Sequence, residues 1–407
     1  ADLYKSKFET KAFARGFRVK SLQNGTIINP VLTEDGAMIG GTVNRFRNDA
    51  FLVQTTNDDN TDYDDVLSAG LNVTWYKGPW TVSADLSTSE AESDFINGVG
   101  WGLLFEDASA DSPVVEGDVS VAYQLNGLDL PDLGFNQDYT DLNKLMLAKW
   151  GTYPYENTDN VDAARLDVSF EFDDNPFLAS IDAGVRYSVR HYTNDRSVFE
   201  FGPDFGHYIG GQEPLQLTDD MVRVINFGGV FGNFPSYLAI DMGQALNAWL
   251  PEGEGTPIKD WDHSWSILQS GTVDETILAA HFMANLDFEL MGLPVIGNLG
   301  VRMIETEQMA TGLQNVRGDV ERGAVPIADG KGEINDQHAR VRIGQTFTDY
   351  LPSLNLNFLL TDNDQLRFAA AKVMTRPPIN RLAADTSGTI SGDGKYSVTS
   401  RNSPYLD

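Results

Sequence analysis

Eight aromatic residues stand in stretches of the chain that are otherwise rich in Gly, Asp, Asn and Pro, the composition of loops. Flat rings with a polar edge supply rigid contact area and suit the apolar side of a pyranose ring. Packing one loop against another uses the same residue types, so both readings stay open. The eight are Trp101, Trp150, Tyr153, Tyr155, Tyr208, Trp249, Trp261 and Trp265. The candidate ligand-binding residues among them are Trp101, Tyr153, Tyr155, Trp261 and Trp265.

A second candidate site is the acidic run from Asp58 to Asp65, in which five of eight residues are aspartate. Hard carboxylate oxygens are the ligands that Ca²⁺ prefers. The run lacks the glycine and the distal glutamate of an EF-hand loop. Acidic runs are ordinarily solvated, so we expect an acidic loop without a metal ion.

For catalysis the sequence offers little. Its 5 histidines form no His-Glu-x-x-His pair, and there is neither a Gly-x-Ser-x-Gly elbow nor a phosphate-binding loop. The chain has no cysteine, which excludes disulfides, thiolate metal sites and cysteine nucleophiles. With 59 acidic residues, carboxylate pairs are too common to indicate a glycosidase by themselves. We predict that the protein is not an enzyme and needs no cofactor.

The formal net charge of −30 excludes nucleic acid as a partner, because a phosphate backbone needs a cationic face. No run of 18 apolar residues is present, so the sequence predicts no transmembrane helix. A mean hydropathy of −0.27 is typical of a soluble protein. It is equally typical of a chain that places its apolar side chains in alternate positions along membrane strands.

Alternation of apolar and polar residues is the strongest signal in the chain, and it occurs in pairs of runs. The first run covers 67–75, and after Gly78-Pro79 the alternation resumes over 80–86. Such a pattern places one set of side chains on each face of a strand, and Gly-Pro makes a tight turn between them. Three further hairpins are predicted, formed by 164–172 with 181–189, by 278–288 with 299–303, and by 354–360 with 366–370.

The connections between these hairpins indicate the architecture. One strand face is apolar and nearly free of charge over the roughly 9–11 residues that a membrane strand needs, but a soluble sandwich would show the same alternation. Short turns join the strands within each hairpin, whereas several tens of residues separate successive hairpins. Unstructured connections of that length are uncommon in compact soluble domains. Outer-membrane barrels combine short periplasmic turns with long extracellular loops, so we predict an all-β, transmembrane antiparallel β-barrel.

Smaller features follow from this prediction. Trp75 and Trp80 flank the first turn, where an interfacial aromatic belt is expected. Residues 237–249 have helical spacing and are expected to form a short loop helix, and 114–125 could form an extra hairpin strand above the membrane. Several arginines on the polar face are expected to form salt bridges rather than ligand contacts. They are Arg165, Arg186, Arg190, Arg302 and Arg367.

Several segments resemble a known family. Residues 351–358, Leu-Pro-Ser-Leu-Asn-Leu-Asn-Phe, followed by 366–377, Leu-Arg-Phe-Ala-Ala-Ala-Lys-Val-Met-Thr-Arg-Pro, are similar to the late-barrel hairpin of TonB-dependent receptors. The similarity is to the proteobacterial subgroup associated with oligosaccharide uptake. Asp-Ala-Gly-Val-Arg-Tyr at 182–187 and Asn-Leu-Gly-Val-Arg-Met at 298–303 resemble a strand-opening Gly-Val-Arg motif of that family.

The resemblance implies a 22-stranded barrel whose lumen holds a plug domain. We count roughly 10–11 strands in residues 1–407, and recognise neither a plug nor closing strands at the C-terminus. The sequence is therefore expected to be an interior piece of the barrel.

The resemblance also implies active import of a nutrient through the outer membrane, with TonB–ExbB–ExbD acting through the missing plug. An oligosaccharide is favoured over a siderophore, and the net charge disfavours an anionic glycan unless calcium bridges it. Two alternatives stay open. One is a passive porin-like channel, which would need no plug. The other is a secreted acidic carbohydrate-binding β-protein, whose outward strand faces would tolerate charge.

Overall fold

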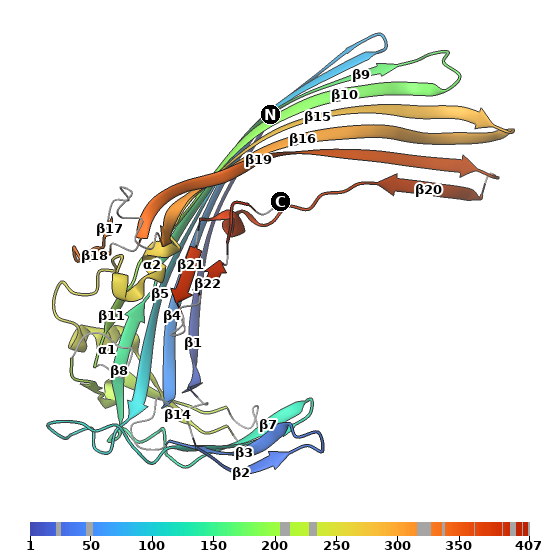
Figure 1. Cartoon of the computed structure of the whole chain (residues 1–407). Coiled ribbons are helices and arrows are strands. Elements are labelled where there is room, and N and C mark those ends of the chain that lie inside the picture. Colours follow the sequence, from blue (N-terminus) through green and yellow to red (C-terminus); the bar gives the residue numbers. More distant parts are fainter. Residues whose placement is uncertain are drawn as a thin grey trace.

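The computed structural model describes the chain as a long, curved β-sheet with smaller elements at one end (Figure 1). It describes all residues except 22–25, 46–51, 204–211, 228–233, 316–326, 336–337, 362, 385, 391–395, 401 and 406–407. The main path of the sheet runs in the order β1-β4-β5-β9-β10-β15-β16-β19-β20. These strands are β1 (Asp2–Lys20), β4 (Leu52–Lys77), β5 (Trp80–Leu104), β9 (Tyr155–Glu171), β10 (Leu178–Arg196), β15 (Gly271–Leu290), β16 (Leu293–Asn315), β19 (His338–Leu359) and β20 (Gln365–Ala371).

Every neighbouring pair on this path is antiparallel, and the short turns all lie at one end of the sheet (Figure 1). Gly78 and Pro79 join β4 to β5, with Lys77 paired to Trp80. Gly78 has φ +55°, a conformation that glycine adopts without steric cost. All four predicted hairpins are confirmed. The described residues place nine strands on the path, against the roughly 10–11 expected from the sequence.

The apolar side chains of successive strands meet in register on one face. Val73 pairs with Ala84, Ala84 with Leu166, Leu166 with Val185, and Val185 with Ala280. No protein covers this row: Val73 is 57% exposed and Leu166 45%. Exposed apolar surface of this extent on consecutive strands marks a face that contacts lipid. The apolar band is therefore the membrane-facing surface of a barrel wall.

Aromatic rings gather at the turn end of this band. Trp75 and Trp80 are both about half exposed there, and the Trp80 ring lies 4.7 Å from that of Phe170. Phe170 in turn lies 4.9 Å from Phe172. Amphipathic aromatic rings favour the interface between lipid and water, so these residues are at the depth expected of one edge of the bilayer.

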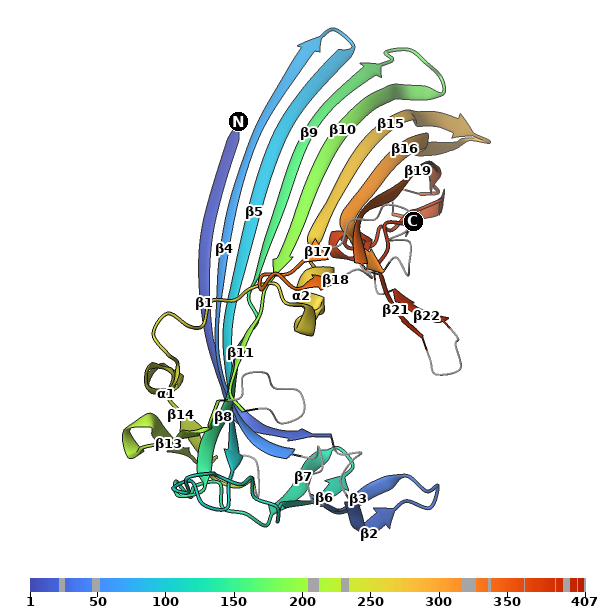
Figure 2. The same ribbon diagram turned by 60° about the vertical axis from the view of Figure 1, so that its left-hand side comes forward.

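The polar side chains lie on the opposite, concave face. A 3-10 helix, η5 (Ile379–Leu382), packs against Val273 and Ala310. Val273 pairs with Tyr192, which shares a strand face with Arg186 and Arg190. The segment that carries η5 lies within the curve of the sheet (Figure 2). The face that carries these arginines is thus the lumen face.

The strands extend far beyond the membrane band. β4 has 26 residues and β5 has 25. Each is more than twice as long as the roughly 9–11 residues that a membrane strand needs. The run from Asp58 to Asp65 lies inside β4, paired to β1 on one side and to β5 on the other. The predicted acidic loop is therefore wrong. Pairing with strands on both sides outweighs the low β-propensity of aspartate.

A smaller four-stranded sheet and several short elements cover the end of the wall away from the turns (Figures 1 and 2). The small sheet consists of β2 (Thr26–Leu32), β3 (Met38–Asn44), β6 (Ser120–Asn126) and β7 (Asp129–Phe135). The other elements are β8 (Leu145–Thr152), β11 (Phe199–Phe201), β12 (Leu215–Gln216), η2 (Asp219–Met221), β13 (Val222–Ile225), β14 (Tyr237–Ile240), α1 (Met242–Trp249), η3 (Trp261–His263), α2 (Trp265–Leu268), β17 (Ile327–Ala328), β18 (Ile334–Asn335), β21 (Thr386–Ile390) and β22 (Tyr396–Ser400).

Two predictions for this region are confirmed in part. Residues 120–125 of the expected extra strand belong to β6, which pairs with β7 in a hairpin. The expected loop helix at 237–249 is helical only from Met242 onward, because Tyr237–Ile240 pairs with β13 as β14. Asp241 caps the helix by accepting a hydrogen bond from the backbone N–H of Gln244, which sets the boundary.

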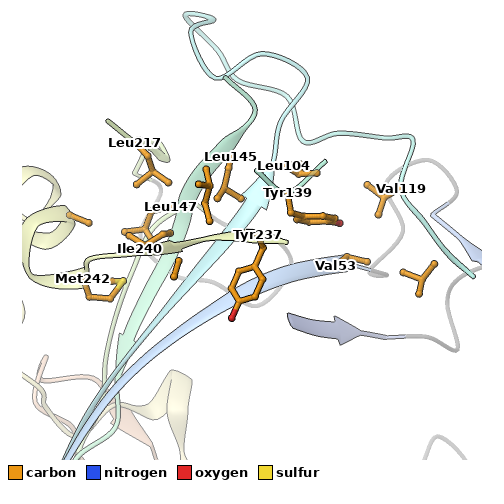
Figure 3. Close-up of a cluster of buried hydrophobic side chains, with 14 of the residues drawn as sticks. Val53, Leu104, Val119, Tyr139, Leu145, Leu147, Leu217, Tyr237, Ile240 and Met242 are labelled. Atoms are coloured by element: carbon orange, nitrogen blue, oxygen red, sulfur yellow. The ribbon is translucent and has the colours of Figure 1, made fainter. Parts of the chain in front are cut away.

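The largest hydrophobic core lies where β14 and α1 pack on the ends of β4, β5 and β8 (Figure 3). Tyr237 and Leu145 are fully buried there. Inside this core the backbone N–H of Ile240 donates to Oδ1 of Asn57 at 2.7 Å. Asn57 shares a strand face with Val73, since β4 keeps an unbroken register with β5 between them. One face of β4 therefore meets lipid near the turns and a protein core at its other end. Among the described residues, no helix is long and apolar enough to cross a membrane.

Candidate functional site

The mouth of the wall, opposite the short turns, brings together several of the residues singled out in the sequence. β8 and β9 continue one another along β5, with Val99 paired to Gly151 and Phe95 paired to Tyr155. Pro154 falls in the gap between them and has no N–H to offer the ladder. The break places Tyr153 and Tyr155 near the height at which β10 ends.

A buried ionic cluster lies beside Tyr153. Nζ of Lys149 lies 2.6 Å from Oε1 of Glu200, and the two side chains are only 4% and 7% exposed. The hydroxyl of Tyr153 donates to the same Oε1 at 2.6 Å. Nε2 of His263 lies 3.1 Å from Oε2 of Glu200. Glu200 therefore ties the segment that carries η3 to β8 and β11.

The charge states of this cluster follow from its contacts. Burial works to raise the pKa of Glu200, but His263, Lys149 and Tyr153 together outweigh it and hold that pKa at about 2. Burial lowers the pKa of Lys149 to about 8, although Glu200 opposes the shift. The contact with Glu200 raises the pKa of His263 above its ordinary value, against the effect of burial. Glu200 is thus the ionised centre of the cluster at neutral pH.

Three of the five candidate aromatics surround this cluster. Nζ of Lys149 lies 5.1 Å from the centre of the Trp101 ring, and Trp101 is 6% exposed. The Trp265 ring lies 5.9 Å from that of Tyr153 and 6.5 Å from that of His263. Lys149, Glu200 and His263 belong to no motif or pattern in the sequence. No spacing signal exists for them, because they meet only through the path of the long loop.

Trp261 lies apart from this group. Its Nε1–H donates to the backbone oxygen of Ile327 at 3.0 Å, and its ring stacks on His338 with centres 5.1 Å apart. The backbone N–H of Trp261 donates to Asp329. These contacts join η3 to the segment around β17.

Tyr155 faces the lumen cavities more openly. Its ring stacks on Phe95 at 4.9 Å and lies 5.1 Å from the guanidinium carbon of Arg196. It lines a cavity of about 360 Å³, together with Tyr192 and the amides of Asn157 and Asn194. Residues 268–271, 380–381 and 383–384 border the same cavity. Oδ1 of Asn194 and Nε of Arg196 are buried here without a hydrogen-bond partner.

The remaining aromatics pack the loop segments together. Trp150 lies 5.8 Å from Phe199. Trp249 lies 4.9 Å from Phe201 and donates to the backbone oxygen of Glu213. Tyr208 lies outside the described residues.

The acidic run on β4 is partly neutralised by cations of β1. Asp59 lies 2.6 Å from Arg15, and Asp65 lies 2.5 Å from Lys7. Alternate residues of a strand point to opposite faces, so the five aspartates do not converge on one point. In the part of the chain that the structure describes, no group of three or more His, Asp or Glu side chains is placed to hold a metal ion.

Comparison with known proteins adds one finding. A family model described as "TonB dependent receptor-like, beta-barrel" matches residues 14–406. No curated protein and no solved structure matches the chain.

Proposed function

Since the chain belongs to the TonB-dependent receptor family, as a part of its β-barrel, we propose that it imports an oligosaccharide bound at the mouth of the lumen. Family membership gives the location and the class of function. The protein is an outer-membrane transporter that works with TonB to import a ligand actively, and it is not an enzyme. This replaces the passive channel and the secreted protein as readings of the sequence.

The observation that carries the sugar proposal is the lumen cavity beside Tyr155. Its volume of about 360 Å³ falls within the range of small-ligand pockets, about 300–1,000 Å³. Two tyrosine rings supply flat apolar contact, and the amides of Asn157 and Asn194 supply both donors and acceptors. A sugar ring presents an apolar face and a rim of hydroxyl groups that both donate and accept. The two sets of groups are complementary.

The five candidate aromatics then act in two ways. We propose that Tyr155 contacts the sugar directly, because it lines the cavity. Trp101, Tyr153 and Trp265 surround the Lys149–Glu200 pair, and Trp261 packs on His338. Their part in binding is to hold the loop segments that border the cavity.

We propose that a plug domain occupies the lumen of the intact receptor and that TonB, driven by ExbB and ExbD, pulls on it. Two arginines of the lumen face are paired with carboxylates of the wall itself. Arg190 lies 2.5 Å from Asp159 on the neighbouring strand, and Arg165 lies 2.6 Å from Asp167. Salt bridges of these two within the wall agree with the role expected of lumen arginines.

Titration calorimetry on the full-length receptor in detergent tests the sugar proposal. The ligands are neutral oligosaccharides with α-1,4, β-1,4 and β-1,3 linkages, and an iron chelate serves as comparison. We expect one linkage type to bind, and Tyr155→Ala to weaken that binding at least tenfold. The matched control is Tyr63→Ala, since Tyr63 is 43% exposed on the outward face of β4. Binding of the iron chelate alone would contradict the sugar and leave the family assignment intact.

A further inference from the structure

Four basic side chains meet on the lumen wall at the height of the membrane band. They come from four consecutive strands: Arg165 of β9, Arg186 of β10, His281 of β15 and Arg302 of β16. Arg186 lies directly opposite Arg165 in the register of β9 and β10, and Arg302 lies directly opposite His281. All four line one cavity of about 360 Å³.

One carboxylate, that of Asp167, contacts two of these four side chains. Oδ2 of Asp167 lies 2.6 Å from Nε of Arg165, and its Oδ1 lies 3.9 Å from Nε2 of His281. Gly184 lies between Asp167 and His281 in the register. A Cβ atom at Gly184 would lie 2.3 Å from Asp167 and 2.5 Å from His281, so glycine is what lets the two side chains approach. Asp167 is therefore engaged by Arg165 and His281.

Arg186 and Arg302 are left without a counter-charge. Across the described strands, neither guanidinium has a salt bridge or hydrogen bond to a protein group, whereas other arginines of the lumen do. Arg190 pairs with Asp159, and Arg376 lies 3.1 Å from Glu275. The chain contains 59 acidic residues and 29 basic ones, so carboxylates are not scarce. The absence of a partner at these two positions is a local feature of the cavity.

Placing like charges directly opposite one another on neighbouring strands destabilises a sheet. Arg165 and Arg186 form such a pair here, and the facing pair of His281 and Arg302 lies beside it, with one carboxylate between the two pairs. Local arrangements that work against stability are most often found at functional sites. The guanidinium group presents a planar fork of donors that matches a carboxylate or phosphate group in a bidentate way.

We propose that Arg186 and Arg302, flanked by Arg165 and His281, form a binding site for a carboxylate or phosphate group inside the lumen. The anion has two sources. One is a carboxylate side chain of a protein domain that occupies the lumen. The other is an anionic group on the imported ligand, and only this source rests on the proposed import function.

The test uses the full-length receptor in detergent, with thermal unfolding as the readout. Inorganic phosphate is compared with chloride at equal ionic strength, for the wild type and for the double variant R186Q/R302Q. An open site predicts that phosphate raises the unfolding temperature of the wild type by at least about 2 °C and leaves that of the double variant unchanged. In chloride, the double variant is then as stable as the wild type or more so, because the repulsion is relieved.

A site that is already filled by a carboxylate of a protein domain predicts the opposite changes in unfolding temperature. Phosphate then has no effect on the wild type, the double variant unfolds at a lower temperature in chloride, and R186E/R302E unfolds lower still. The variant R186K/R302K keeps the charges and recovers part of the loss, which a general packing defect would not allow. R367Q, at an exposed arginine of β20, is the matched control and leaves both readouts unchanged.

The proposal is overturned if phosphate leaves the wild type unaffected and R186Q/R302Q is as stable as the wild type. That result is distinct from failure of the sugar proposal, which depends on the Tyr155 cavity at the mouth and on calorimetry with neutral sugars. An open, phosphate-binding site found while no neutral sugar binds would indicate an anionic ligand. The sequence had disfavoured such a ligand from net charge alone.

Discussion

Nζ of Lys149 and Oε1 of Glu200 lie 2.6 Å apart in the best-shielded ionic contact at the mouth of the barrel. Such a pair stabilises less than its geometry suggests, because both charges lose their hydration. Breaking it from one side is costly, since the other charge stays buried and loses its counter-ion. The pair holds β8 against β11, and through His263 it holds the segment around η3.

The change Glu200→Gln should therefore destabilise the mouth by about 3–5 kcal/mol. Hydrogen exchange of β8 and β11 in the full-length receptor measures this locally. Replacing both partners, as Lys149→Met with Glu200→Leu, should cost less than Glu200→Gln alone, because neither charge of the pair is then left in the core. Glu156→Gln, at an exposed position, is the control. A double variant that loses more than Glu200→Gln would show that the pair itself stabilises strongly.

The contact between His263 and Glu200 should make the segment around η3 sensitive to pH. Glu200 raises the pKa of His263 above its ordinary value of about 6.5. The protonated form is therefore favoured in the folded state. Its stabilising contribution is complete below about pH 6.5 and is lost as the pH rises through the raised pKa. Limited proteolysis between residues 255 and 270 should accelerate over that interval. In His263→Gln this acceleration should disappear, and an identical pH profile in the variant would exclude the histidine.

Substitutions on the two faces of β5 should differ in cost. Ala84 pairs with Val73 and Leu166 on the lipid face, whereas Ser83 pairs with Thr74 and Asp167 on the lumen face. Ala84→Arg should destabilise the barrel by about 2–4 kcal/mol. Ser83→Arg should cost much less, and Val168→Arg should behave like Ala84→Arg. Unfolding in urea from lipid vesicles gives the free energies, and equal costs on both faces would contradict the register.

Two aromatic substitutions should separate binding from packing. Tyr155→Ala removes a ring that lines the lumen cavity, and should weaken ligand binding at least tenfold, by about 1.4 kcal/mol or more, with little loss of stability. Trp261→Ala removes a stacked ring and a hydrogen bond to Ile327, and should lower stability by about 1–3 kcal/mol. Calorimetry and thermal unfolding on both variants give the comparison. The reverse pattern would assign the contact role to Trp261.

Asn57→Ala should loosen α1 and β14 from the wall. The variant leaves the backbone N–H of Ile240 buried without an acceptor, which costs about 1–3 kcal/mol. Faster hydrogen exchange of β14, with unchanged exchange in β15, is the expected result. Thr74→Ala, at an exposed position of the same strand, is the control. Equal protection of β14 in the variant and the wild type would mean that packing alone holds it.

The sequence predicts the strands of the wall best in the part that contacts lipid. Alternation around Val73 and Ala84 is strict, because one face meets lipid and the other meets the lumen. Around Asp58 the same strand has no such contrast on its two faces, so its residues resemble those of a loop. The Lys149–Glu200 contact cannot be predicted from the sequence for another reason. It joins residues about fifty positions apart through a loop whose path no periodic pattern encodes.

The order of the strands has a consequence for how the chain assembles. In the wall, each hairpin joins segments that are neighbours along the chain, so its closure loop is short and its entropy cost small. At the mouth, the bond from Ile240 to Asn57 closes a separation of 183 residues. Contacts over such distances form slowly. We expect the wall to form first, hairpin by hairpin, and the elements at the mouth to condense onto it last. Pulse-labelled hydrogen exchange during refolding should protect β15 and β16 before β14.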